Sequence, residues 1–403
     1  MKLLRRFNVV WTLILVALIY LSIFYSFISA DAPYYLSIAR DLSNGLILYK
    51  DILNSYTPAM MYLNSMIYRI FDDPGYHYFL VFQYVMILAS SGFLYLICRK
   101  LDLDKLKSTF LGLLLFIAVL SSDGNYINLE VYILLCVLLS FWFLINKQFF
   151  WTGIFLALSF FSKQYGILNF IPFFLLVGLY YGFEKKYLIN FLIGSILPLL
   201  VFLVYYLIIE NVTFISLIEQ LSGSGYGQKG IASTKSLFSV FAGSKVFLLL
   251  IFPLFFLRIK PLKNIIDAVL ILGILINLIP IAIQSFQHYY ILTFPYIFML
   301  IARNLKNFNR NFFLVSNLSL ILISGFLFFR ILRYKDVHKE QIKIAKKYEV
   351  DFPVGSRVFL FGEIRYLYIL NNYHNPVLSE IGYSYPFIPD KDFREKYPVL
   401  QLE

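Results

Sequence analysis

The chain has 403 residues, of which 60% are hydrophobic, 19% aromatic and 14% charged, and its mean hydropathy is +0.74. This composition is far more apolar than that of ordinary soluble proteins, so it predicts a polytopic membrane protein and excludes a soluble globular one. The net charge of +12 does not indicate nucleic acid, because the Lys and Arg residues form short clusters between apolar runs. Clusters placed in this way are typical of membrane topology and lipid contact.

A membrane-spanning helix needs roughly 20 mostly apolar residues. The sequence offers eleven such runs, with approximate bounds 9–28, 77–98, 109–122, 128–146, 149–162, 165–183, 187–209, 244–257, 264–284, 288–302 and 311–330. The first run has a basic flank like that of a signal peptide, but it is longer than a signal peptide's apolar region, so we expect an uncleaved span. The predicted fold is all-α, with about 11 transmembrane helices.

The distribution of basic residues predicts the orientation of these spans. With the N-terminus in the cytoplasm, the inner segments carry sixteen Lys and Arg residues, whereas the outer loops before the tail carry seven. The positive-inside rule favours this orientation. It places the loops 29–76 and 210–243 and the C-terminus outside the cytoplasm, as in a multi-pass protein of a bacterial-type inner membrane.

The first outer loop and the tail have patterns of their own. In the loop, YYLSIARDLSNGLILY and MMYLNSMIYRIF carry apolar residues at helical spacing, which predicts short helices that either lie in the membrane interface or pack on the bundle. In the tail, DVHKEQIKIAKKYEV predicts a charged helix, Pro353–Gly355 a turn, RVFLFG a strand, and IRYLYILNN and PVLSE a further helix and strand. We therefore expect a transmembrane domain over 1–330 and a small extracytoplasmic α/β appendage over 331–403.

Ionisable residues at the outer ends of four separate predicted spans are the main indication of chemistry. Asp31 follows the first span, Asp123 the third, Lys163 the fifth and His288 the ninth. Glu130, seven residues after Asp123, lies within the fourth span, where an unpaired carboxylate is costly and raises a functional hypothesis. Because these positions meet at one membrane face, Asp31, Asp123 and Glu130 are the candidate catalytic residues.

Each of these residues also has a plainer interpretation. Asp123 precedes a glycine and fits a turn. Lys163 lies on the outer side, against the positive-inside trend, which favours an anionic partner, and snorkelling to lipid phosphate is the alternative. His288, with Tyr289 and Tyr290, also fits an interfacial aromatic belt.

Other motifs are sparse. The chain lacks a nucleophile elbow, a kinase signature and a dinucleotide fingerprint, and the glycine-rich stretch 222–230 lacks the P-loop pattern. Both cysteines fall inside apolar runs, which favours two core thiols over a disulfide. The four histidines are widely separated and form no helical ligand pair, which indicates no metal site made by the protein alone. These residues are Cys98, Cys136, His77, His288, His338 and His374.

Several stretches together resemble one family. Asp31 directly after the first span, then Tyr35, GLILYKD and SYTPAMMYL, resembles the first outer loop of GT-C-type membrane glycosyltransferases. NLEVYILL, LALSFFSKQYGILNFIP, HYYILTFPYIFMLIA and RVFLFGEIRYLYILNN are similar to that family's later landmarks. The resemblance is to the bacterial relatives of protein O-mannosyltransferases and of the lipid A aminoarabinose transferase, and it covers most of the chain in order.

The resemblance implies a polyisoprenyl-phosphate-linked sugar as donor, an active site on the outer face, a role in the cell envelope such as lipopolysaccharide modification, and a catalytic role for the acid after the first span, here Asp31. Many members have a second acid next to it, whereas this chain has Ala32, so the resemblance leaves a divalent cation as an open question and we assign no cofactor. The expected partners are the donor, membrane lipid and a glycan, lipid or protein acceptor. The predicted substrate-binding residues are Tyr34, Tyr35, Tyr49, Asp51, Lys163, Gln164, His288 and Tyr289.

Three other functions remain open from the sequence. A polymerase or ligase of surface polysaccharide also needs basic residues on the outer face. A transporter of lipid-linked sugar places its site near the midplane, often between repeated halves, whereas here the polar residues collect at the rim. An assembly protein is the third alternative. A groove open to the bilayer that ends at Asp31 would distinguish the enzyme from a transporter and from an assembly protein.

Overall fold

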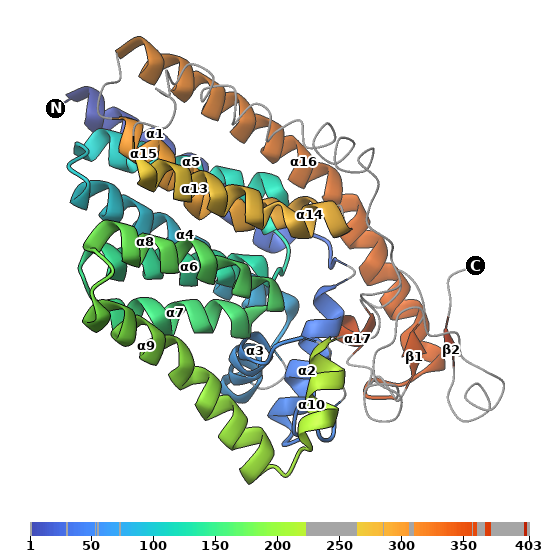
Figure 1. The fold of residues 1–403 in the computed structure, drawn as a ribbon. Helices are drawn as coiled ribbons and strands as arrows, with labels where there is room; N and C mark the ends of the chain where they lie inside the picture. Colours follow the sequence, from blue (N-terminus) through green and yellow to red (C-terminus); the bar gives the residue numbers. More distant parts are fainter. Residues whose placement is uncertain are drawn as a thin grey trace. The chain divides into compact units, whose positions relative to one another are not determined.

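The computed structural model describes residues 2–29, 31–52, 54, 56–71, 74–222, 264–284, 286–305, 310–356, 358–360, 367–371 and 399–400. These residues are mostly helical (Figure 1), as predicted. The chain divides into two compact units, each described by itself below. The helical unit comprises Met1–Tyr20, Gln83–Val201 and Lys229–Arg330, and the loop-and-tail unit comprises Leu21–Phe82, Phe202–Gln228 and Ile331–Glu403.

The helical unit is built from apolar helices joined by short turns. In chain order its elements are α1 (Lys2–Tyr25), α4 (Tyr76–Lys100), α5 (Lys105–Val119), η1 (Leu120–Gly124), α6 (Glu130–Ile145), α7 (Phe149–Ser162), η2 (Gln164–Asn169), α8 (Phe170–Tyr181), α9 (Lys185–Leu203), α13 (Ile265–Asn277), α14 (Ile279–Gln284), η4 (Gln287–Thr293), α15 (Phe294–Asn304) and α16 (Arg310–Asp351). The helices α1, α4, α9 and α16 continue into the other unit. In Figure 1, α6 lies beside α7, and α13 beside α15.

Four helical segments are long and apolar enough to cross a membrane, so the chain is a multi-pass membrane protein: Tyr76–Lys100, Lys105–Gly124, Lys185–Ile209 and Ile265–Ile283. Ten of the predicted spans overlap helices of the structure, and the span 244–257 lies outside the described residues. The number of crossings stays a prediction, because several of the other apolar helices are shorter than a full span.

Local sequence explains how several of these helices begin and pack. Asp104 caps α5, because its side chain accepts from the backbone N–H of Lys107 at 2.9 Å. A Cβ atom on Gly194 of α9 would come within 2.0 Å of the Phe150 carbonyl oxygen on α7. Glycine at this position therefore permits the close approach of α7 and α9, as small residues commonly do between membrane helices.

The loop-and-tail unit contains the first loop and the tail. Its elements are α2 (Ala32–Ser43), α3 (Ala59–Ile70), η3 (Val204–Ile209), α10 (Phe214–Ser222), α17 (Leu367–Leu370) and the parallel two-residue strands β1 (Phe359–Leu360) and β2 (Val399–Leu400). The two predicted loop helices coincide with α2 and α3. Every residue of α2 from Ala32 to Leu42 is buried, which fits a helix packed on protein. By contrast, α3 exposes Leu63, Met66 and Ile70 along one face, as expected of a helix in the interface.

The tail differs in part from its prediction. The charged segment 336–350 is helical, but it is the continuation of α16, which runs without a break from the last predicted span. The turn at Pro353–Gly355 is present, with Gly355 at a φ of +83°. β1 lies within the predicted strand RVFLFG, and α17 within IRYLYILNN. PVLSE and most of the glycine-rich stretch 222–230 lie outside the described residues, and the appendage as a separate domain stays a prediction.

Candidate active site

The polar residues of the helical unit gather where α5 ends and α6 begins. The helix α5 passes into the π-helical turn η1, where Asp123 has a φ of 61° in the left-handed region. Asp tolerates this conformation better than most residues, and the turn interpretation of Asp123 is confirmed. Its carboxylate also accepts from Arg330 of α16, with Nη2 and Oδ1 2.6 Å apart. The charge of Asp123 is therefore balanced within this unit.

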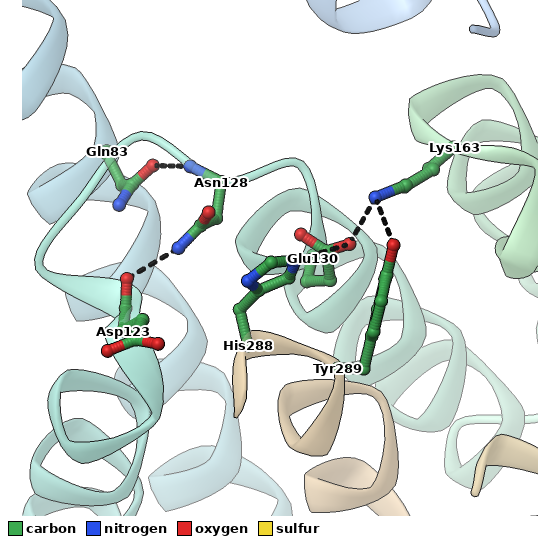
Figure 2. Close-up of polar contacts among 7 residues, drawn as sticks. All are labelled: Gln83, Asp123, Asn128, Glu130, Lys163, His288 and Tyr289. Atoms are coloured by element: carbon green, nitrogen blue, oxygen red, sulfur yellow. Dashed lines mark hydrogen bonds and ion pairs between the residues drawn. The ribbon is translucent and has the colours of Figure 1, made fainter. Parts of the chain in front are cut away.

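Gln83 of α4 fixes the segment that connects Asp123 to Glu130 (Figure 2). Its side-chain amide is fully buried, donates to the carbonyls of Gly124 and Tyr126, and accepts from the backbone N–H of Asn128 at 2.8 Å. The Asn128 side chain in turn donates to the backbone carbonyl of Asp123. One glutamine thus satisfies three backbone groups of a buried, non-helical segment.

Glu130 and Lys163 form a buried ion pair at the end of this segment. The Lys163 ammonium donates to Glu130 Oε1 at 2.7 Å and to the Tyr289 hydroxyl at 3.3 Å, and the two charged side chains are 3% and 1% exposed. The ammonium also lies 4.7 Å from the centre of the Tyr289 ring, which is within cation–π range. Burial of Lys163 excludes snorkelling to lipid in this structure.

His288 belongs to the same cluster. Its Nε2 atom lies 4.0 Å from Glu130 Oε1, which is too far for a hydrogen bond but close enough for a charge interaction when the ring is protonated. Its ring stacks on Phe286 with an interplanar angle of 10°. Glu130, Lys163, His288 and Tyr289 converge as Figure 2 shows. The carboxylate, ammonium, imidazole and phenol can together bind an anion and exchange a proton.

One further predicted residue of this unit, Gln164, lies next to Lys163 in the chain. Gln164 opens η2 directly after Lys163 and is half-buried. Within the described ranges, the structure has no group of three His, Cys, Asp or Glu side chains placed to hold a metal ion. Both Asp123 and Glu130 are already paired with protein cations, so the cluster does not resemble a cation site.

Asp31 belongs to the loop-and-tail unit and is exposed. It lies at the N-cap of α2, which starts with Ala32 and Pro33, and its side chain makes no capping hydrogen bond. The chain before it is held by Gln341 of α16, which accepts from the Ile28 N–H at 2.9 Å and donates to the Ile28 carbonyl at 3.0 Å. An exposed carboxylate without a capping hydrogen bond fits a proton acceptor.

The predicted tyrosines lie beside Asp31 in the chain but are buried. Tyr34 donates to the Asn54 side chain at 2.8 Å, and its ring and that of Tyr35 contact the Tyr56 ring. Tyr49 donates to the Tyr56 carbonyl at 2.6 Å. Burial holds the pKa of Tyr49 well above its ordinary value of 10.0, so it keeps this proton. These rings support the loop.

Asp51 has a local partner as well, because its carboxylate accepts from the backbone N–H of Ile47 at 2.8 Å. Gln220 of α10 joins the same loop by donating to the Tyr49 carbonyl at 3.0 Å and accepting from the Asn54 N–H at 3.1 Å. The substrate-binding roles of Tyr34, Tyr35, Tyr49 and Asp51 stay predictions.

The comparisons with known proteins identify the fold. The chain is similar to ArnT from Cupriavidus metallidurans in the apo state, with a TM-score of 0.69, 11% identity, and coverage of 92% of this chain and 85% of that chain. It is also similar to the same protein bound to undecaprenyl phosphate, with a TM-score of 0.64, 11% identity, and coverage of 91% and 85%. The chain has a GT-C-type fold.

This finding confirms the predicted resemblance at the level of the fold. ArnT is a GT-C lipid A aminoarabinose transferase. No family model and no curated protein matches the sequence. At 11% identity the GT-C-type fold is shared, while the donor, the acceptor and the residue roles belong to the proposal below.

Sequence reasoning missed four side chains that hold the candidate residues: Gln83, Asn128, Arg330 and Gln341. Gln83 gave a signal, because it is an amide inside the apolar run 77–98 and such a group needs internal partners. Arg330 also gave a signal, because it is a charged residue at the end of the apolar run 311–330. Glu130 and Lys163 were each predicted, but not as partners, since 33 positions separate them.

Proposed function

We propose that this protein is a membrane glycosyltransferase that moves a sugar from a polyisoprenyl-phosphate donor to a hydroxyl acceptor on a lipid, glycan or protein at the outer face of the membrane. The observation that carries the proposal is the GT-C-type fold, which matches ArnT over more than nine-tenths of this chain. One of the matching ArnT structures contains undecaprenyl phosphate. Such a donor suits a protein whose apolar helices lie in lipid.

Asp31 is the proposed general base. In sugar transfer the acceptor oxygen attacks the anomeric carbon of the donor, the bond from that carbon to the phosphate oxygen breaks, and the acceptor proton must be removed. An ionised carboxylate within hydrogen-bond reach of the acceptor hydroxyl can take that proton as attack develops. Asp31 is exposed and makes no capping bond, so its oxygens are available to an acceptor.

Lys163 is the proposed stabiliser of the departing phosphate. Negative charge grows on the phosphate as the sugar leaves, and a fixed cation stabilises that charge most strongly in a buried setting. Lys163 is buried and oriented by Glu130 and Tyr289.

The activity is tested with the purified chain, radiolabelled polyprenyl-phosphate sugars and membrane extract. We expect label to move into a glycan, lipid or protein acceptor, with release of an equal amount of polyprenyl phosphate. Label that crosses the wall of a sealed vesicle while remaining on the donor lipid would contradict the proposal and favour a transporter. Incorporation only from preassembled oligosaccharide donors would favour a polymerase or ligase.

A further inference from the structure

A groove in the helical unit lies between α1, α4 and α5. Its lining includes Leu15 of α1, Leu88, Ser91 and Tyr95 of α4, and Thr109 and Gly112 of α5. Its volume is about 180 Å³, more than ten times the roughly 10–15 Å³ that one water molecule needs. Most of the lining is apolar, so an apolar group is the expected occupant. Because α4 and α5 are long and apolar enough to cross a membrane, that group would come from a lipid.

The two helix faces that line the groove continue into cations at the same end. On α4, Leu88, Ser91 and Tyr95 follow one another at helical spacing, and Arg99 comes one turn later on the same face. On α5, Lys105 precedes Thr109 and Gly112 on one face in the same way. Arg99 and Lys105 each lie four residues beyond the groove lining, about 6 Å along the helix axis.

The charge at this end is suited to an anion. Arg99 and Lys105 are both exposed, and neither forms an ion pair among the described residues. One guanidinium nitrogen of Arg99 donates to the Leu103 carbonyl at 2.6 Å, which leaves its other N–H groups for a ligand. The neighbouring Lys107 lies 3.6 Å from Asp104 and is thereby partly neutralised.

This end of the helices is remote from the candidate active site. Gln83 fixes the active-site loop from about two turns inside α4. Arg99 lies sixteen residues further along the same helix, about 24 Å at 1.5 Å per residue. A lipid phosphate at Arg99 would therefore be separate from one at Lys163. The predicted orientation also places Arg99 and Lys105 on the cytoplasmic side, where anionic lipids attract basic residues.

We propose that the groove is a binding site for an anionic phospholipid, with an acyl chain between α1, α4 and α5 and the headgroup phosphate held by Arg99 and Lys105. The proposal commits to a phospholipid of net negative charge because the apolar groove adjoins two cations. It does not depend on sugar transfer, since none of its residues belongs to the proposed catalytic set.

Native mass spectrometry of the full chain in detergent tests the headgroup, with phosphatidylglycerol and phosphatidylcholine of identical acyl chains as the probes. The wild type should retain phosphatidylglycerol in preference to phosphatidylcholine. The double variant R99Q/K105Q should reduce that preference by about 30-fold, as expected when two cations near an anionic headgroup are removed. The control K185Q/K186Q removes two exposed cations at the start of α9 and should keep it.

A second pair of variants tests the groove. Leu88→Trp adds a large ring to the groove lining. Leu96→Trp is the control, because Leu96 lies on the same helix outside the lining and is 42% exposed, against 43% for Leu88. We expect L88W to weaken binding of both lipids and L96W to leave it unchanged. Thermal unfolding checks that both variants are folded. Three results would each overturn the proposal. They are equal retention of the two lipids by the wild type, a loss of the phosphatidylglycerol preference in K185Q/K186Q as large as in R99Q/K105Q, and unchanged lipid binding in L88W.

Discussion

Glu130 and Lys163 illustrate how one residue pair can be both structural and functional. Removing two charges from water costs several kcal/mol per ion, and the attraction between them repays this cost only with good geometry. Here the two atoms are 2.7 Å apart, and Tyr289 adds a second hydrogen bond to the ammonium. Even with this geometry, the attraction within the pair is offset by the cost of removing both charges from water, so the pair alone does not establish a stabilising role. Variants must separate its effect on stability from its effect on activity.

The first prediction is a double-mutant cycle on this pair. Lys163→Met leaves the buried Glu130 carboxylate without its 2.7 Å partner and should lower the stability to unfolding by about 3–5 kcal/mol. Glu130→Gln together with Lys163→Met removes both charges and should recover most of that loss. Donor binding should remain lost in the double variant, because the phosphate-binding cation is absent.

The measurements are thermal unfolding in detergent and binding of a polyprenyl-phosphate lipid. Lys147→Met is the matched control, because Lys147 is exposed and lies 5.9 Å from the Tyr181 ring without an ion pair among the described residues. Recovery of donor binding along with stability in the double variant would show that Lys163 acts only through folding.

Sequence reasoning at the residue scale found the ionisable residues but not their partners. Asp123, Glu130, Lys163 and His288 stood out because charges and imidazoles are rare between apolar runs. The pairing of Lys163 with Glu130, and of Asp123 with Arg330, depends on which helices are neighbours. Hydrophobic periodicity does not encode that information, since it repeats along every apolar helix.

At the scale of single elements, the connection between η1 and α6 depends on Gln83. The second prediction is that Gln83→Leu leaves three buried backbone groups unpaired, at a cost of about 1–3 kcal/mol for each group that finds no water. The thermal midpoint should fall and transfer activity should be lost.

Ser90→Ala is the control for Gln83 on the same helix. Among the residues that the structure describes, the Ser90 hydroxyl donates only to the Met86 carbonyl one turn earlier, and that carbonyl already accepts within the helix. A Q83L variant with the stability and activity of S90A would remove Gln83 from the account of the loop.

The third prediction concerns the contact of α7 with α9. Gly194→Ala forces a Cβ atom against the Phe150 backbone and should destabilise the protein by about 1–3 kcal/mol, as overpacking does. Gly92→Ala is the control, since its added Cβ meets no other described residue within 4 Å apart from its own helix backbone and chain neighbours. Alanine there should raise stability by up to about 1 kcal/mol. A thermal midpoint that is unchanged in G194A would show that α7 and α9 separate easily.

The helices themselves were largely predictable from the sequence, because runs of apolar residues mark their extent. The exceptions are local. The charged segment after residue 330 was predicted as a separate helix, but neither glycine nor proline breaks α16 between Gly325 and Pro353, so the helix continues. The burial of α2 was not predictable, because its amphipathic spacing fits a membrane surface and a protein surface equally well.

At the scale of the whole molecule, the orientation in the membrane remains a prediction from the positive-inside rule. The fourth prediction is tested by cysteine labelling in a chain whose own thiols, Cys98 and Cys136, are replaced by Ala. Val354→Cys should be labelled from outside and Asp102→Cys from the cytoplasm, and both positions are exposed. Ser108, in the first turn of α5, is fully buried and therefore unsuitable. Labelling of position 354 from the cytoplasm alone would reverse the proposed face of the active site.

The fold could be predicted more fully than the function. A GT-C-type fold is maintained at 11% identity, because apolar runs and their order can persist while individual residues change. Donor and acceptor specificity depends on a few side chains whose roles do not follow from periodicity. Only activity measurements on single residues can assign these roles.

The measurement that tests the central proposal most directly compares sugar transfer by Asp31→Asn with that by Asp336→Asn. Asn keeps the size of the side chain but cannot accept the acceptor's proton, so D31N should lose about 10²–10⁴-fold in rate. Both carboxylates are exposed, so both variants should insert and unfold within about 0.5 kcal/mol of the wild type. D31N should still bind the donor lipid, and D336N should transfer sugar normally. Near-normal transfer by a folded D31N would remove Asp31 from the mechanism and contradict the proposed chemistry.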